Sequence, residues 1–479
     1  MTTQKTYLEL SQDSGVSHKF YEVIVDDCTM SIRYGRIGTN GQQSSKTFPS
    51  HDKATSEAAK KIRSKQKKGY AEAEMGVRKK RSITRRAISS STSKAKRAPV
   101  LWKFDTGRAA FGVFVDDNGC WVGNEAGRIF SLDHEGKTDR EIKLPDGVKC
   151  IVSDGDWLYA GCDDGNVYDL TGKMPFVAYE IDAKVDIYWL DIADGVLAVS
   201  DNSGNVYVFN HEDVTQWSAK SAGSSGWMVR CDEIGVYHGH SKGVTMYDWE
   251  DGSQIWERST GGSVLFGWQE ESTVYAGCGN TRVYRFSKQG EPMGEYKCDA
   301  AVYSCAATED GKYVFAGDSS SSVYCFDESG TRLWKMATKC GSAYSMQFHN
   351  DRLYIVTTTG ALACIDASEE AITAADKGVV PKVRDIKASS APAASAAQVA
   401  TSNTQLETVA DAGDGIVVEC YKEGSKLRCR VITEGYQNSW NVQFPRNLRE
   451  EGARFVVDEI RESSRGGFYR AYGNIRKLA

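Results

Sequence analysis

The chain has 479 residues, 41% of them apolar and 10% aromatic, and is long enough for two or three packed domains. No stretch approaches the ~18 consecutive apolar residues of a membrane-spanning helix, and the N-terminus lacks the pattern of a secretory signal. The 13 cysteines are scattered without metal-ligand spacing. We therefore expect a cytoplasmic protein with reduced thiols and no metal, cofactor or membrane partner.

Charge is distributed unevenly along the chain. Residues 1–98 carry 21 Lys and Arg against 9 Asp and Glu, residues 99–412 carry 26 against 46, and residues 413–479 carry 12 against 9. A basic N-terminal part joined to an acidic middle predicts a polyanionic partner for the basic part only.

The N-terminal region, residues 1–76, is predicted to form strands followed by one helix. Residues 6–50 contain the short alternating segments TYLEL, KFYEVIV, TMSIRYG and SSKTF. The segment SHDKATSEAAKKIRSKQKKGY then favours a basic helix with Ser50 or Asp52 as its N-cap. Its apolar face would consist of Ala54, Ala58 and Ile62.

One stretch, IRYGRIGTNGQ from Ile32 to Gln42, combines two arginines, an aromatic residue and three glycines. The order of RYGRIGTNGQ, KTF and a helix ending in KKGY resembles the WGR domain of DNA-dependent poly(ADP-ribose) polymerases and bacterial molybdate-metabolism-regulator-like proteins, over about residues 5–75. The resemblance implies that Tyr34, which replaces the family's Trp, and Arg36 contact DNA and neighbouring domains. Tyrosine offers a smaller stacking surface than tryptophan.

The same motif suits a phosphate-backbone site on physical grounds. Glycines allow a ligand to approach the main chain closely, arginines and lysines neutralise phosphates, and an aromatic ring can pack on a sugar or base. The alternative is that Tyr34 and Arg36 only pack on the helix as scaffold. The candidate nucleic-acid-binding residues are Arg33, Tyr34, Gly35, Arg36, Gly38, Gln42, Lys46, Lys61, Lys65 and Lys68.

Residues 77–98 form a basic linker that includes RKKRSITRRAISSSTSKAKR. Its low hydrophobicity cannot build a core, so we expect a disordered tether that neutralises phosphates without reading sequence. The alternative is a solvated linker without a ligand. Binding of nucleic acid would make the protein nucleoid-associated in a bacterium, and RKKR could act as a nuclear signal in a eukaryote.

Seven similar segments follow within residues 99–369. Each has a short apolar strand, a turn rich in Gly, Asp, Asn or Ser, and a second alternating strand, as in LYAGCDDGNVYDLTG, with steps of 38–40 residues. A period of ~40–45 residues with four strands is that of a propeller blade. The pattern resembles WD-repeat and quinoprotein-like propellers. Because VLWKF precedes the first hairpin, we expect residues 100–104 to close the ring beside 360–366.

Two segments remain after the propeller. Residues 370–412 are rich in Ala and Ser with almost no aromatic residues, which predicts a flexible linker. Residues 413–479 contain five or six short strands, enough for a small barrel-like domain. Its arginines interleave with aromatic residues and could bind a nucleic acid or a peptide, although the aromatic residues are also needed for its core.

No catalytic motif of the GxSxG, P-loop or HExxH type occurs, and HGH at 238–240 reads as a turn variant rather than a metal site. We predict a mainly β protein: a seven-bladed β-propeller with an N-terminal α+β WGR domain and a small C-terminal β-barrel-like domain. The preferred function is a non-enzymatic adaptor that binds nucleic acid, DNA above all, through the WGR domain and basic linker, and protein through the propeller. The alternatives are a pure protein scaffold whose WGR domain contacts protein and, less favoured, a quinoprotein-type oxidoreductase.

Overall fold

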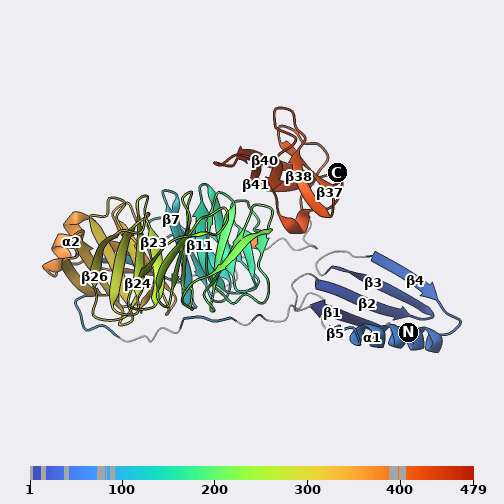
Figure 1. Cartoon of the computed structure of the whole chain (residues 1–479), viewed down its shortest axis with the longest axis horizontal. Coiled ribbons are helices and arrows are strands. Elements are labelled where there is room, and N and C mark those ends of the chain that lie inside the picture. Colours follow the sequence, from blue (N-terminus) through green and yellow to red (C-terminus); the bar gives the residue numbers. More distant parts are fainter. Residues whose placement is uncertain are drawn as a thin grey trace. The chain divides into compact units, whose positions relative to one another are not determined.

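The structure is a computed structural model that describes residues 4–11, 18–36, 42–72, 81, 83–86, 92–387, 397–398 and 406–479 (Figure 1). The chain divides into two compact units, one within residues 1–80 and one that comprises residues 81–400 and 404–479. The described residues are mostly strands, with two α-helices. Neither helix is long and apolar enough to cross a membrane.

The first unit is an antiparallel five-stranded sheet with one helix packed on it, in the strand order β4-β3-β2-β1-β5. Its elements are β1 (Gln4–Ser11), β2 (His18–Asp26), β3 (Thr29–Arg36), β4 (Gln42–Thr47), α1 (His51–Gln66) and β5 (Ala71–Glu72). Ser50 is the N-cap, since its side chain accepts a hydrogen bond from the Lys53 amide at 3.3 Å. Ala54 and Ala58 of α1 pack on the core residues Leu8, Tyr21, Val23, Val25, Met30 and Ile32.

Within the described part of the second unit, seven sheets of four or more strands form the propeller. The first three blades are β7 (Ala110–Asp116), β8 (Gly119–Asn124), β9 (Arg128–Leu132), β10 (Thr138–Lys143); β11 (Val148–Asp154), β12 (Trp157–Cys162), β13 (Asn166–Asp169), β14 (Phe176–Glu180); and β15 (Ile187–Ala193), β16 (Val196–Asp201), β17 (Asn205–Phe209), β18 (Thr215–Lys220). The next three are β19 (Met228–Cys231), β20 (Val236–His240), β21 (Gly243–Tyr247), β22 (Gln254–Ser259); β23 (Val264–Gln269), β24 (Thr273–Cys278), β25 (Arg282–Ser287), β26 (Pro292–Lys297); and β27 (Val302–Ala307), β28 (Tyr313–Asp318), β29 (Ser322–Asp327), β30 (Arg332–Ala337).

The last blade closes the ring as expected. It consists of β31 (Ala343–His349), β32 (Arg352–Thr357), β33 (Ala361–Asp366) and the early strand β6 (Val100–Asp105). β6 pairs antiparallel with β33, with Trp102 opposite Cys364 and Phe104 opposite Leu362. The inner strands β31 and β7 contact each other, so the inner strands form a continuous ring around the central channel.

The described parts of the segment 370–412 are more ordered than the sequence predicted. It contains most of α2 (Glu369–Asp376), β34 (Arg384–Lys387), β35 (Ala397–Gln398) and β36 (Thr408–Val409). Ser368 caps α2, whose Ile372 and Ala375 pack on the core of the last blade, and β34 pairs with β6. The prediction of a flexible linker was wrong for these parts. In α2 the alanines that looked like linker composition favour a helix, whereas the three strands are ordered by pairing with β6, β10 and β41 (Phe468–Leu478).

The C-terminal strands form one sheet with the order β36-β41-β40-β37-β38, and β39 pairs with β41. The elements are β37 (Ile416–Glu423), β38 (Lys426–Val431), β39 (Asn441–Gln443), the 3₁₀ helix η1 (Arg446–Leu448), β40 (Arg454–Glu462) and β41 (Phe468–Leu478). Its buried core includes Val418, Phe444, Phe455 and Tyr469.

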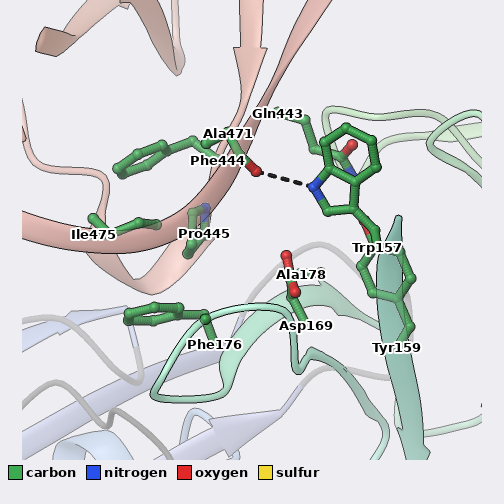
Figure 2. A pocket seen from close by; sticks show the side chains of 12 residues that line it. Trp157, Tyr159, Asp169, Phe176, Ala178, Gln443, Phe444, Pro445, Ala471 and Ile475 are labelled. Atoms are coloured by element: carbon green, nitrogen blue, oxygen red, sulfur yellow. Dashed lines mark hydrogen bonds between the residues drawn. The ribbon is translucent and has the colours of Figure 1, made fainter. Parts of the chain in front are cut away.

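This C-terminal domain is docked on the propeller. The Trp157 indole donates a hydrogen bond to the Ala471 carbonyl at 3.0 Å, beside a small pocket that both domains line (Figure 2). Arg470 donates to the Tyr159 hydroxyl at 2.9 Å and pairs with Asp154 at 2.8 Å. Other contacts are Arg446 with Asp213, Arg461 with Asp156, Gln443 with Tyr179, and the Phe468 ring on the His211 ring. Several arginines considered for ligand binding therefore hold the two domains together.

Candidate nucleic-acid interface

Tyr34 lies on the sheet face that α1 covers, but the residue remains 42% exposed. In the β2–β3 pairing it lies directly opposite Tyr21, and the two ring centroids are 6.2 Å apart. Tyr21 is buried and also contacts Tyr70 edge-on at 6.4 Å. Tyr21 and Tyr70 thus belong to the core, whereas Tyr34 extends this aromatic group to the surface.

Lys65 contacts this aromatic group, and three further lysines lie near Lys65. The Lys65 ammonium lies 4.4 Å from the Tyr21 ring centroid and 5.2 Å from that of Tyr70. Burial lowers the pKa of Lys65, and the positive charges of Lys68, Lys19 and Lys61 lower it further. Lys19, Lys61 and Lys68 therefore lie near enough for their charges to act on Lys65. We call Tyr34 and these four lysines the Tyr34 surface.

Lys19 was missed by the sequence reasoning. It precedes Tyr21 by two residues on β2, so both side chains belong to the same sheet face. The strand pairing also places Lys19 opposite Arg36. Only the register of the β2–β3 hairpin, which the sequence did not define, brings Lys19 next to the helix lysines.

Arg33 belongs to the opposite face of the sheet from Tyr34. Its Nε donates to the Glu22 carboxylate at 2.9 Å, and Lys5 pairs with the same carboxylate at 2.8 Å. Burial alone would raise the pKa of Glu22, but the hydrogen bonds and charges of Lys5 and Arg33 outweigh it and lower that pKa. The Arg33 guanidinium also lies 5.1 Å from the Phe20 ring centroid. Arg33 therefore has a structural contact in this domain.

The other candidates are only partly grouped. Gln42 is exposed and pairs with Tyr34 across β3 and β4, whereas Lys46 pairs with Met30 at the far end of the same strands, 5.3 Å from the Phe48 ring. Gly35 lies in β3 opposite Phe20. The Arg36 side chain and the whole of Gly38 lie outside the described residues.

The basic linker differs from its prediction. Of residues 77–98, the structure describes Arg81, 83–86 and 92–98, and these contact the propeller. Arg85 pairs with Asp163, and Arg86 donates to main-chain carbonyls of inner strands. The prediction of a disordered tether was therefore wrong for this part. A segment too polar to form a core of its own can still be ordered by acceptors that another domain supplies.

The HGH segment lies within β20, in the core of its blade. His238 Nδ1 is 2.6 Å from the Ser221 hydroxyl, and His240 Nε2 is 2.9 Å from the Thr245 hydroxyl. Burial lowers the pKa of His238 to about 3 and that of His240 to about 4. Among the described residues, no group of three or more His, Cys, Asp or Glu is placed to hold a metal ion.

These features define a multidomain β-propeller protein with a binding or scaffold role. Residues 4–77 match the WGR domain, residues 139–168 match the WD domain, G-beta repeat, and residues 319–373 match the outer membrane protein assembly factor BamB. The chain thus contains a WGR domain followed by WD40-type and BamB-type repeats, as the sequence predicted. No curated protein matches it.

Two solved structures resemble the propeller, each at 13% identity and a TM-score of 0.47. One is the computationally designed Ika8 protein, which is covered over 100% of its length and covers 57% of this chain. The other is the WD40 β-propeller domain of Doa1, which is covered over 99% of its length and covers 60% of this chain.

Proposed function

We propose that the protein is a non-enzymatic adaptor that binds nucleic acid, in particular DNA, through the Tyr34 surface of its WGR domain, while the propeller serves as a platform for protein partners. The observations that carry the proposal are the exposure of Tyr34, which is 42%, and the Lys65 ammonium 4.4 Å from the ring of its neighbour Tyr21. Lys19, Lys61 and Lys68 lie near enough for their charges to act on Lys65. An exposed aromatic residue on the same face as a group of lysines suits a sugar-phosphate backbone with an accessible base or sugar. His238 and His240, the paired histidines of the propeller, are buried and hydrogen-bonded, so they offer no exposed general base.

The charges predict how binding depends on salt. Each phosphate that a lysine neutralises contributes about −0.9 to the slope of log K against log salt on duplex DNA. Full engagement of the four lysines therefore corresponds to a slope of about −3.6. Because lysines contact phosphates rather than base edges, different sequences should bind about equally well.

The test is fluorescence anisotropy of the full chain with blunt duplex, nicked duplex, single-stranded DNA and RNA, over a range of salt concentrations. Tyr34→Ala should weaken binding by a stacking contribution of about 1–3 kcal/mol. The double variant Lys61→Gln with Lys68→Gln should flatten the salt slope by about 1.8. Lys53→Gln is the matched control, because Lys53 lies on the same helix, is 58% exposed and pairs with Glu57 away from Tyr34.

Two results would contradict the proposal. One is the absence of salt-dependent binding to any of the four probes, which would favour a scaffold whose WGR domain contacts protein. The other is equal binding by the Tyr34 variant, the double lysine variant and the Lys53 control, which would place any nucleic-acid site elsewhere on the chain.

A further inference from the structure

One end of the propeller channel is occupied by an arginine of the chain itself. The Arg86 guanidinium donates to the main-chain carbonyls of Tyr303 at 2.9 Å, Tyr344 at 3.3 Å and Leu265. It also lies over the rings of Tyr344 at 4.5 Å, Tyr303 at 4.8 Å and Trp227 at 5.7 Å. Burial lowers the pKa of Arg86, yet no carboxylate pairs with it among these contacts. Carbonyl dipoles and ring faces therefore hold this charge.

These acceptors all come from the same end of the inner strands. Leu265, Tyr303 and Tyr344 are each the second residue of their strand, β23, β27 and β31, and Trp227 directly precedes β19. Equivalent inner strands of a propeller run in the same direction, so their first residues meet at one mouth of the channel. We call this region the channel mouth.

Two further arginines extend the contact around the channel mouth. Arg85 pairs with Asp163, has Glu125 at 3.6 Å and lies over the Phe111 ring at 5.3 Å. Arg81 donates to the carbonyls of the segment before β15. Its acceptors are Ile181 at 3.0 Å and Asp182 and Val185 at 2.6 Å each.

A neutral residue fixes the segment between these arginines. The Thr84 hydroxyl and amide both donate to Asp186, at 2.6 and 3.1 Å. The guanidinium of Arg81 occupies the space that a Cβ atom at Gly165 would need, and that of Arg85 occupies the corresponding space at Gly147. Residues 81 and 83–86, which we call the strap, are thus held by acidic side chains, carbonyls, rings and glycines of several blades.

The chemistry of the channel mouth favours arginine over lysine. A planar guanidinium can donate to several carbonyls in its plane while its face stacks on aromatic rings, whereas an ammonium on a flexible stem cannot do both. We propose that the channel mouth is a receptor for arginine-containing basic peptide segments, with the strap as its resident ligand. A partner segment of the same chemistry binds by replacing the strap. This inference rests on the proposed role of the propeller as a protein platform and not on nucleic-acid binding.

The tether sets how strongly the strap competes. A ligand joined by a short linker has an effective concentration on the order of 1 mM. A free peptide that binds the vacant mouth with a Kd of about 50 µM would therefore bind the wild-type chain about 20-fold more weakly, if the strap binds equally well.

The test uses the full chain and a fluorescein-labelled peptide with the sequence of residues 78–88, RKKRSITRRAI. In one variant the mouth is vacated by Arg81→Gln, Arg85→Gln and Arg86→Gln. We expect this variant to bind the peptide at least tenfold more tightly than wild type. A peptide with lysine in place of Arg81, Arg85 and Arg86 should bind the variant at least tenfold more weakly. Lys94→Gln with Lys96→Gln, which removes two exposed charges of the same basic segment, is the control and should behave as wild type.

Thermal unfolding gives a second readout. The peptide should raise the melting temperature of the vacated variant and leave that of wild type unchanged. If the vacated variant does not fold, Thr84→Glu replaces it, since a carboxylate against Asp186 should release the strap while all three arginines stay in place.

The proposal is overturned if a folded vacated variant fails to bind the peptide, or binds the lysine peptide equally well. It is also overturned if neither variant folds, because the strap would then be a permanent part of the propeller. Anisotropy with duplex DNA on the same samples separates the two proposals: peptide binding without DNA binding contradicts only the nucleic-acid adaptor.

Discussion

Replacing Arg470 should release the C-terminal domain from the propeller and lower its stability. The residue is only 3% exposed, and it joins Tyr159, Asp154 and the Gln443 side chain, the last at 3.1 Å. Its guanidinium also lies 3.8 Å from the Trp157 ring centroid. Burial would lower the pKa of Arg470, but Tyr159 and Asp154 raise it, so the residue stays charged.

Arg470→Met keeps much of the volume and leaves Asp154 without its charged partner. Removing one member of a buried ion pair costs about 3–5 kcal/mol. At an m-value on the order of 3 kcal/mol/M, the urea midpoint of the unit should fall by about 1–1.7 M. Tryptophan fluorescence measures this directly, because Trp157 lies in the interface.

The matched control is Arg454→Met, which removes a 53% exposed arginine paired with Glu419 in the same domain. Surface pairs of this kind contribute about 0–1 kcal/mol, so its midpoint should hardly change. If Arg470→Met and Arg454→Met shift the midpoint equally, Arg470 does not fasten the two domains and the reasoning fails.

Three further predictions concern stability. Because the pKa of Glu22 is lowered in the folded state, its contribution to the free energy of unfolding is present above the unfolded pKa near 4.3 and is lost as pH falls through the folded pKa. Glu22→Gln should therefore remove this pH dependence from the melting temperature of the WGR domain. His238 has a pKa of about 3 in the fold, so the free energy of unfolding should fall by up to about 1.4 kcal/mol per pH unit as pH falls below about 6.5. Calorimetry from pH 7 to 4 should show that the melting temperature of His238→Gln declines less steeply than that of wild type. Trp102→Ala should cost about 3–5 kcal/mol, because the buried ring closes the last blade and its indole donates to the His134 carbonyl at 2.9 Å; equal urea midpoints for Trp102→Ala and wild type would refute the closure argument.

The propeller was predictable because its information is local and repeated. Each hairpin contains its own turn residues and alternating strands, and the unpartnered aromatic segment at Val100–Asp105 indicated how the ring closes. The order of strands before the helix in the WGR domain followed from the same kind of pattern.

Contacts between distant residues were not predictable in this way. Arg86 is ordered by Leu265, Tyr303 and Tyr344, which lie about 180 to 260 residues further along the chain. In the WGR domain, Tyr34 could be named from its motif, but the position of Lys19 beside Lys65 depends on strand register and on where α1 ends. Neither the acceptors of Arg86 nor the position of Lys19 can be inferred from the local sequence.

The closure of the propeller also sets an order of events during synthesis. β6 leaves the ribosome early, but its partner β33 is made about 260 residues later, which takes about 13–50 s at 5–20 residues per second. During that time an aromatic strand has no partner in its blade and both of its edges are open to other nascent chains. The growing propeller should therefore be a chaperone client until its last hairpin emerges, and a premature stop before Ala361 should yield an aggregating ring rather than a smaller stable one.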